Sequence, residues 1–120
     1  MTAAVTFQFG TMTPQGMSHL SVDYVQVPVS AWQAGTSYNP TSDTVQWAFM
    51  PQATQVPAGG DWVAGSWDTA PTSLIYPYVA KCLLGTAGTT ALTIGAYYAY
   101  VKIQDSPEIP VLIAGSLEIS

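Results

Sequence analysis

Nine prolines spread along 120 residues set the first limit on what this chain can fold into. They stand at positions 14, 28, 40, 51, 57, 71, 77, 107 and 110, and ten glycines interrupt the remaining segments. Proline lacks the amide hydrogen that an α-helix needs and clashes with the preceding turn, so this spacing leaves almost no room for a long helix. No segment keeps the i, i+3, i+4, i+7 apolar spacing of a helix, and we therefore expect strands.

Between these breaks the apolar residues alternate with period two, which is typical of half-buried strands. The pattern is clear over Ser21 to Trp32, Thr44 to Met50, Tyr76 to Leu84, Ala96 to Gln104 and Ile109 to Ile119, and weaker over Asp61 to Trp67. Each clear segment places one apolar set on a single face: Val25, Val27, Val29 and Ala31; Val45, Trp47 and Phe49; Tyr78, Ala80 and Cys82; Tyr97, Ala99, Val101 and Ile103; and Val111, Ile113, Leu117 and Ile119. Short strands with regular turn signals predict an all-β fold, an immunoglobulin-like antiparallel β-sandwich over residues 18–120.

The first seventeen residues differ from the rest because they carry no charge and break into glycine, threonine and proline. They are predicted to form an extended N-terminal arm, residues 1–17, outside the core. Val5, Phe7 and Phe9 alternate along this arm. We expect these side chains to bind a partner by adding a strand to an exposed sheet edge.

The scarcity of charge excludes several functions. Charged residues make up 8% of the chain, against about 25% in an average protein. Two lysines, no arginine and a net charge of −5 exclude binding to nucleic acid or to anionic membranes, both of which need clustered positive charge. Residues 82–101 carry no charge, yet their threonines and glycines predict a turn rather than a membrane span. No signal peptide is predicted, and we expect synthesis in the cytoplasm.

Catalytic and metal-binding groups are also scarce. Cys82 and His19 are the single cysteine and the single histidine, and they form the only conceivable nucleophile–base pair. We expect Cys82 to be a buried small apolar residue instead. Asp61 and Asp68 lie in loop-like sequence, where aspartate more often caps a turn than binds calcium. The chain is therefore not expected to be an enzyme, nor to have a catalytic residue, a cofactor or a metal.

The aromatic residues leave two interpretations open. Trp62 and Trp67 could stack on sugar rings in a carbohydrate-binding domain, or they could close one end of the sandwich. Tyr98 and Tyr100 lie on the face opposite the predicted core, where we expect them to be exposed. Exposed tyrosines on a sheet are typical of a protein interface.

The strand segments together resemble small structural proteins of tailed bacteriophages, especially those that infect actinobacteria. The segments are SVDYVQVPVSAW, NPTSDTVQWAFMP, GDWVAGSWDT, YVAKCLLG and LTIGAYYAYVKIQDSPEIPVLIAGSLEIS. They are also similar to the immunoglobulin-like N-terminal domain of phage upper baseplate proteins. In that domain, a segment PVDLTGATVxF precedes a strand GTYxAxV, and here residues 39–47 and 95–101 stand in those places. The resemblance covers roughly residues 20–120.

This resemblance implies a structural protein of the virion, made in the host cytoplasm. The expected roles are a capsid decoration or head accessory protein, or a head–tail component. The expected partners are major capsid, connector or tail subunits, with the chain itself forming a homo-oligomer or binding to a lattice. The alternative is a tail or baseplate domain that binds carbohydrate or attaches to the host. Few charges and many aromatic residues suit repeated burial in a symmetric assembly.

Overall fold

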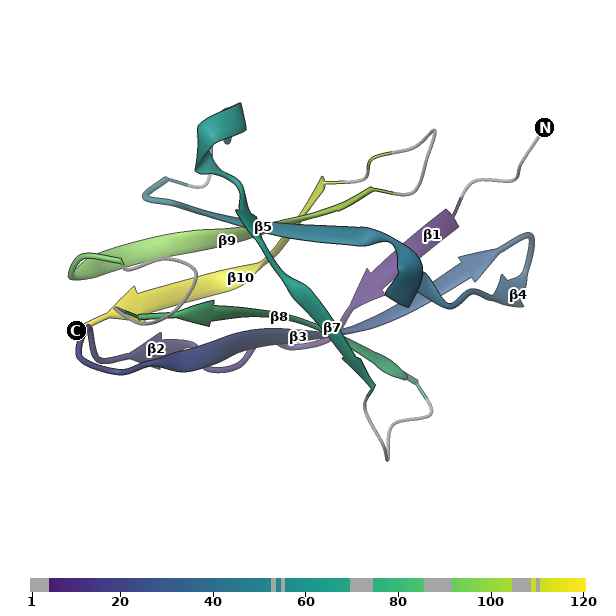
Figure 1. Ribbon diagram of the computed structural model, residues 1–120, viewed down its shortest axis with the longest axis horizontal. Coiled ribbons are helices and arrows are strands. Elements are labelled where there is room, and N and C mark those ends of the chain that lie inside the picture. Colours follow the sequence, from purple (N-terminus) through teal and green to yellow (C-terminus); the bar gives the residue numbers. More distant parts are fainter. Residues whose placement is uncertain are drawn as a thin grey trace.

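The computed structural model describes residues 5–52, 54, 56–69, 75–85, 92–104, 109 and 111–120. Within these ranges the chain forms β-strands and two short 3₁₀ turns, and no α-helix (Figure 1). The strands are β1 (Val5–Phe9), β2 (Gly16–Met17), β3 (Asp23–Gln33), β4 (Thr36–Ser37), β5 (Thr44–Met50), β6 (Val63–Ala64), β7 (Ser66–Thr69), β8 (Tyr78–Leu84), β9 (Gly95–Gln104) and β10 (Val111–Ile119). The 3₁₀ turns are η1 (Pro40–Ser42) and η2 (Gly59–Asp61). The predicted all-β class is confirmed.

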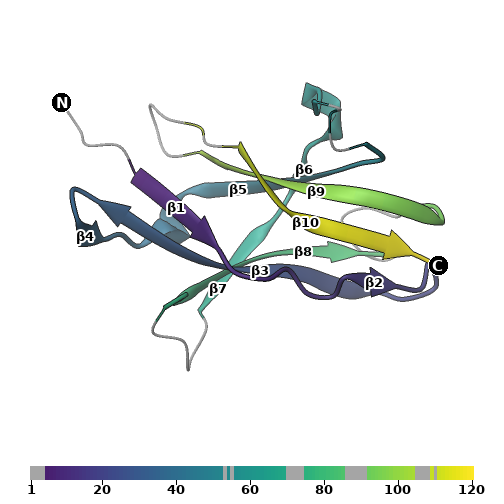
Figure 2. The same ribbon diagram turned by 180° about the vertical axis from the view of Figure 1, so that it is seen from behind.

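The strands form two sheets. The first sheet has the order β1-β3-β8-β7, with β4 added to β3, and the second has the order β2-β10-β9-β5-β6. Among the described strands every pairing is antiparallel except that of β2 with β10. Figures 1 and 2 show the sheets as two layers, and the main cluster of buried side chains draws on strands from both.

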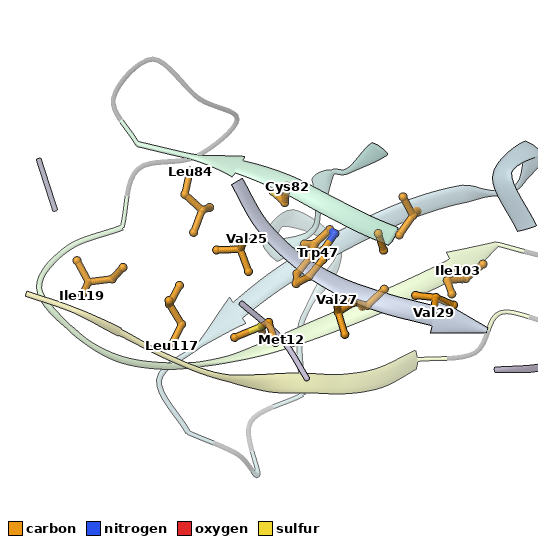
Figure 3. Close-up of a cluster of buried hydrophobic side chains, with 14 residues drawn as sticks. Met12, Val25, Val27, Val29, Trp47, Cys82, Leu84, Ile103, Leu117 and Ile119 are labelled. Atoms are coloured by element: carbon orange, nitrogen blue, oxygen red, sulfur yellow. The ribbon is translucent and has the colours of Figure 1, made fainter. Parts of the chain in front are cut away.

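The core lies between the sheets, where the period-two pattern predicted it for β3, β5, β8 and β9. Its buried members are Met12, Val25, Val27, Val29, Val45, Trp47, Ala80, Cys82, Leu84, Ala99, Val101, Ile103, Leu117 and Ile119 (Figure 3). Trp47 on β5 is the largest of these side chains. Its ring stacks on that of Phe49 with an interplanar angle of 12° and centroids 6.0 Å apart.

The last strand does not keep the single apolar face predicted for it, which comprised Val111, Ile113, Leu117 and Ile119. Leu117 and Ile119 are buried, whereas Val111 and Ile113 are 48% and 51% exposed. The pairing of β10 with β9 shifts by one residue between Ile113 and Gly115. A β-bulge of this kind inserts one residue and moves all later side chains to the opposite face. The predicted face was therefore wrong for the first half of β10.

The N-terminal segment differs from the predicted arm. β1 pairs with β3 in the first sheet, and β2 pairs with β10 in the second. Thr13 bridges to Gln26 between them. Val5 and Met12 are buried, and Met12 belongs to the main core. An arm outside the core is not confirmed, because residues 5–17 complete the edges of both sheets; residues 1–4 lie outside the described residues.

The chain crosses from the second sheet to the first at Gly65, the single residue between β6 and β7. A Cβ atom at this position would lie 2.7 Å from Trp47 Cδ1 and 2.9 Å from the carbonyl oxygen of Lys81. The Gly65 amide donates a hydrogen bond of 2.9 Å to the carbonyl oxygen of Val45. The crossing therefore requires glycine, since the backbone passes directly against the buried indole ring.

Replacing Gly65 by alanine tests this close approach. We expect Gly65→Ala to lower the free energy of unfolding by about 1–3 kcal/mol, because the added methyl group overpacks the core against a rigid ring and backbone. Urea titration followed by tryptophan fluorescence measures the change. Gly60→Ala is the matched control, since a Cβ atom there meets nothing within 4 Å. Equal unfolding midpoints for the two variants would contradict the account.

Replacing Met12 by alanine tests whether the N-terminal segment belongs to the core. We expect Met12→Ala to destabilise the protein by about 2–5 kcal/mol, as large-to-small changes in a core do. The exposed neighbour Thr11, changed to alanine, should be nearly neutral. If Met12→Ala unfolds at the same denaturant concentration as Thr11→Ala, the segment is not part of the core.

Candidate functional site

The apolar side chains of β1 face the interior. Val5 is buried, and Phe7 and Phe9 are half-buried and pack against the main core. β1 therefore covers the edge of its own core with the side chains that were predicted to reach a partner. The alternation was visible in the sequence, but it does not tell which sheet the strand joins.

Tyr98 and Tyr100 lie on the outer face of the second sheet, within a second apolar cluster. Tyr100 is only 8% exposed and packs with Ala48 and Met50, and Trp62 and Tyr98 pack against this group. The expectation of an exposed Tyr100 was wrong because this cluster covers it. Trp62 covers this cluster because of the register between β5 and β6. Val63 pairs with Trp47, so Trp62, the residue before β6, comes opposite Ala48 on the same outer face.

The two tryptophans proposed as a sugar-stacking pair lie on different faces. Trp62 packs on the outer face of the second sheet, and the Nζ atom of Lys102 lies 4.5 Å from its ring centroid. Trp67 on β7 pairs with the buried Ala80, packs against the main core and donates its Nε1–H to the carbonyl oxygen of Asp43 at 2.9 Å. The structure does not bring them together as one aromatic platform.

The exposed apolar residues nearest to the second cluster lie at the start of β10. Val111 pairs with Lys102 and Ile113 with Tyr100, so both lie on the outer face and extend the cluster to the margin of the sheet. Ile109, just before the strand, is 54% exposed. The strand next to β10 is β2, and it pairs only with Glu118 and Ile119. Within the described residues, no strand pairs with the backbone edge of residues 111–117 that faces away from β9. We name Ile109, Val111, Ile113 and this unpaired backbone the β10 edge.

Cys82 and His19 are not joined by a hydrogen bond in the described part of the chain. The Nδ1 atom of His19 lies 2.8 Å from the carbonyl oxygen of Ser120. Cys82 is buried in the core, and loss of solvent raises the pKa of its thiol from 9.0 to about 12. A thiol with so high a pKa is protonated near neutral pH and is a poor nucleophile.

A hollow of about 270 Å³ lies beside the crossing at Gly65. Its lining residues are Tyr24, Ala64, Gly65, Ser66, Lys81, Cys82 and Leu83. The ammonium group of Lys81 is already engaged, because its Nζ lies 4.6 Å from the ring centroid of Tyr24 and 3.2 Å from Asp68 Oδ2. Neither this lysine nor the protonated thiol of Cys82 is poised for chemistry, so the hollow is a weaker candidate than the β10 edge.

Asp61 and Asp68 both serve local structure. Asp61 caps a turn as predicted, accepting a hydrogen bond of 2.8 Å from the amide of Ala58. Asp68 pairs with Lys81 instead. Over the described ranges there is no group of three or more histidine, cysteine or acidic side chains that could hold a metal ion. In the same ranges no helix is long and apolar enough to cross a membrane.

Comparison with known proteins adds no relative. No protein-family model, curated protein or solved structure matches this chain. The resemblance to proteins of tailed bacteriophages therefore stays a prediction. Any functional proposal rests on the residues of the chain itself.

Thiol labelling tests the environment of Cys82. At pH 8 we expect a disulfide reagent to react with the native thiol at least about a hundredfold more slowly than with the urea-unfolded chain, because both burial and the raised pKa oppose attack. Since the unfolded thiol ionises near pH 9 and the folded one near pH 12, stability should fall as the pH rises through this interval. Comparable rates in native and unfolded protein would contradict the buried position.

Proposed function

We propose that this chain is an immunoglobulin-like assembly module of a tailed-phage virion that acts through protein–protein contacts. The strand order supports the fold: β1-β3-β8-β7 corresponds to strands A-B-E-D of an immunoglobulin domain, and β10-β9-β5 to G-F-C. Residues 5–17 would then be the first strand of the domain, which changes sheet midway.

Two side chains support the same fold. Trp47 is fully buried on β5, the strand that corresponds to strand C, where immunoglobulin domains carry a core tryptophan. Tyr97, near the start of β9, donates its hydroxyl hydrogen to the carbonyl oxygen of Thr93 at 2.9 Å. A tyrosine that bonds back to the preceding backbone at this corner is a recurrent feature of such domains. The disulfide of antibody domains has no counterpart, because Ala99 stands two residues after this tyrosine and Cys82 lies on β8.

The observation that carries the functional proposal is the β10 edge. It combines half-exposed Val111, Ile113 and Ile109 with an unpaired strand margin, and its sequence from 109 to 117 has no charged residue. An exposed apolar strand margin is normally blunted by charge, proline or a bulge, or covered by a partner. This run has Pro110 and the bulge at Ile113–Gly115 but no charged side chain, and its exposed apolar side chains favour a partner as the cover.

The energy of one such contact is small. Complete burial of a valine or isoleucine is worth about 1.5–3 kcal/mol, so these half-exposed side chains would contribute roughly 1 kcal/mol each. A micromolar complex needs about 8 kcal/mol. Many copies bound in a symmetric lattice make up the difference, because each contact raises the effective concentration of the next. A structural protein present in many copies suits this surface better than a one-to-one receptor does.

The proposal is tested on particles of the phage that carries the gene. We expect mass spectrometry of purified particles to detect the chain at a fixed copy number that fits a ring or a lattice. Ile113→Glu should enter particles at least about tenfold less, because its cross-strand neighbour is Tyr100 and a buried unpaired carboxylate is costly. Val56→Glu is the matched control, since Val56 is apolar and 84% exposed elsewhere. Particles that lack the wild-type chain would contradict the proposal.

A further inference from the structure

We propose that the β10 edge binds the same edge of a second copy of this chain, by antiparallel pairing about a two-fold axis. This inference rests on the proposed assembly function and names a first partner for it. Residues 111–114 offer a strand margin with no partner strand among the described residues, whereas residues 118 and 119 are covered by β2. Such a margin is a template for one more strand.

Charge permits a second copy on this side of the molecule. The chain carries a net charge of −5, so two copies that meet at random bring like charges together. β1 lies at the margin of the first sheet, and β10 lies near the margin of the second. The segment from β1 to β2 joins these two margins, so they lie on the same side of the molecule (Figure 2). Residues 5–17 and 109–117 contain no charged side chain. Two copies can therefore meet along this side without electrostatic repulsion between facing residues.

The strand is complementary to itself in one register. With the two-fold axis at Leu112, Val111 of each copy lies opposite Ile113 of the other. Both side chains point to the outer face, as their pairing with Lys102 and Tyr100 shows. Cross-strand pairs of β-branched residues are favourable. The pairing would also join the outer apolar clusters of the two copies, since Ile113 adjoins Tyr100 in each.

The pairing closes at a dimer. Each copy has one β10 edge, and a two-fold axis uses both. The opposite margin of the second sheet is β6, which has only two residues before the chain leaves the sheet at Gly65. The two-fold pairing leaves this margin outside the interface, so we expect a closed pair in which the second sheet runs from one copy into the other.

Sedimentation velocity over about 1 μM to about 1 mM tests the dimer. We expect the average mass of the wild-type protein to rise from 12.7 kDa toward twice that value with concentration. Ile113→Lys should weaken association at least about tenfold, because it buries an unpaired charge. Val56→Lys, which lies outside the edge, should associate like the wild type. Circular dichroism confirms that each variant is folded.

A mixing experiment tests the register. Ile113→Glu and Val111→Lys are each expected to be monomeric, since residue 113 lies beside Tyr100 and residue 111 beside Lys102, and neither neighbour offers an opposite charge. An equimolar mixture should associate, because the axis at Leu112 places the introduced glutamate of one variant opposite the introduced lysine of the other. A wild type that stays at 12.7 kDa throughout, or a dimer that Ile113→Lys leaves intact, overturns the proposal. A monomer that still enters particles overturns this dimer alone and leaves the assembly function standing. If the wild-type chain forms the dimer but is absent from particles, the assembly function is overturned and the dimer stands.

Discussion

The packing of Trp47 between the two sheets is the contact on which the other features depend. The ring is fully buried, stacks on Phe49 and lies directly against the backbone at Gly65. Because Val63 pairs with Trp47, the residue before it, Trp62, reaches the outer face and packs against the cluster that buries Tyr100. The outer face is thus covered at β5 and β9 but remains exposed and apolar at β10. The cover over Tyr100 follows from the position of this ring, whereas the exposed edge follows from the short pairing of β2 with β10.

The sequence predicted the parts of this fold that depend on local alternation. Val25, Val27 and Val29 are buried as expected, because each strand shows one face to the core. The bulge in β10 could not be seen in this way, since a single inserted residue leaves an apolar run looking continuous. Gly115 was the available signal, because glycine inside a strand often marks a bulge or a close approach, and Met12 packs against it.

The candidate site was harder to predict because it depends on long-range pairing. The alternation of Val5, Phe7 and Phe9 shows that β1 covers a core, but only its pairing with β3 shows that the core is its own. Likewise, no local sequence pattern shows that Trp62 lies beside Tyr100. The scarcity of charge, by contrast, was informative. Both lysines lie over aromatic rings, Lys81 at Tyr24 and Lys102 at Trp62. Lys102 is the cross-strand neighbour of Val111, but its ammonium group lies over the Trp62 ring, next to β6.

Hydrogen–deuterium exchange at the β10 edge tests the central claim, that its backbone is covered by a second copy, most directly. Peptides that span residues 111–114 are compared at a dilute and at a concentrated condition, with peptides from the core strand β5 as an internal reference. Strand pairing between copies predicts slower exchange at 111–114 in the concentrated sample and no change in β5. Exchange that is equally fast at both concentrations would contradict it.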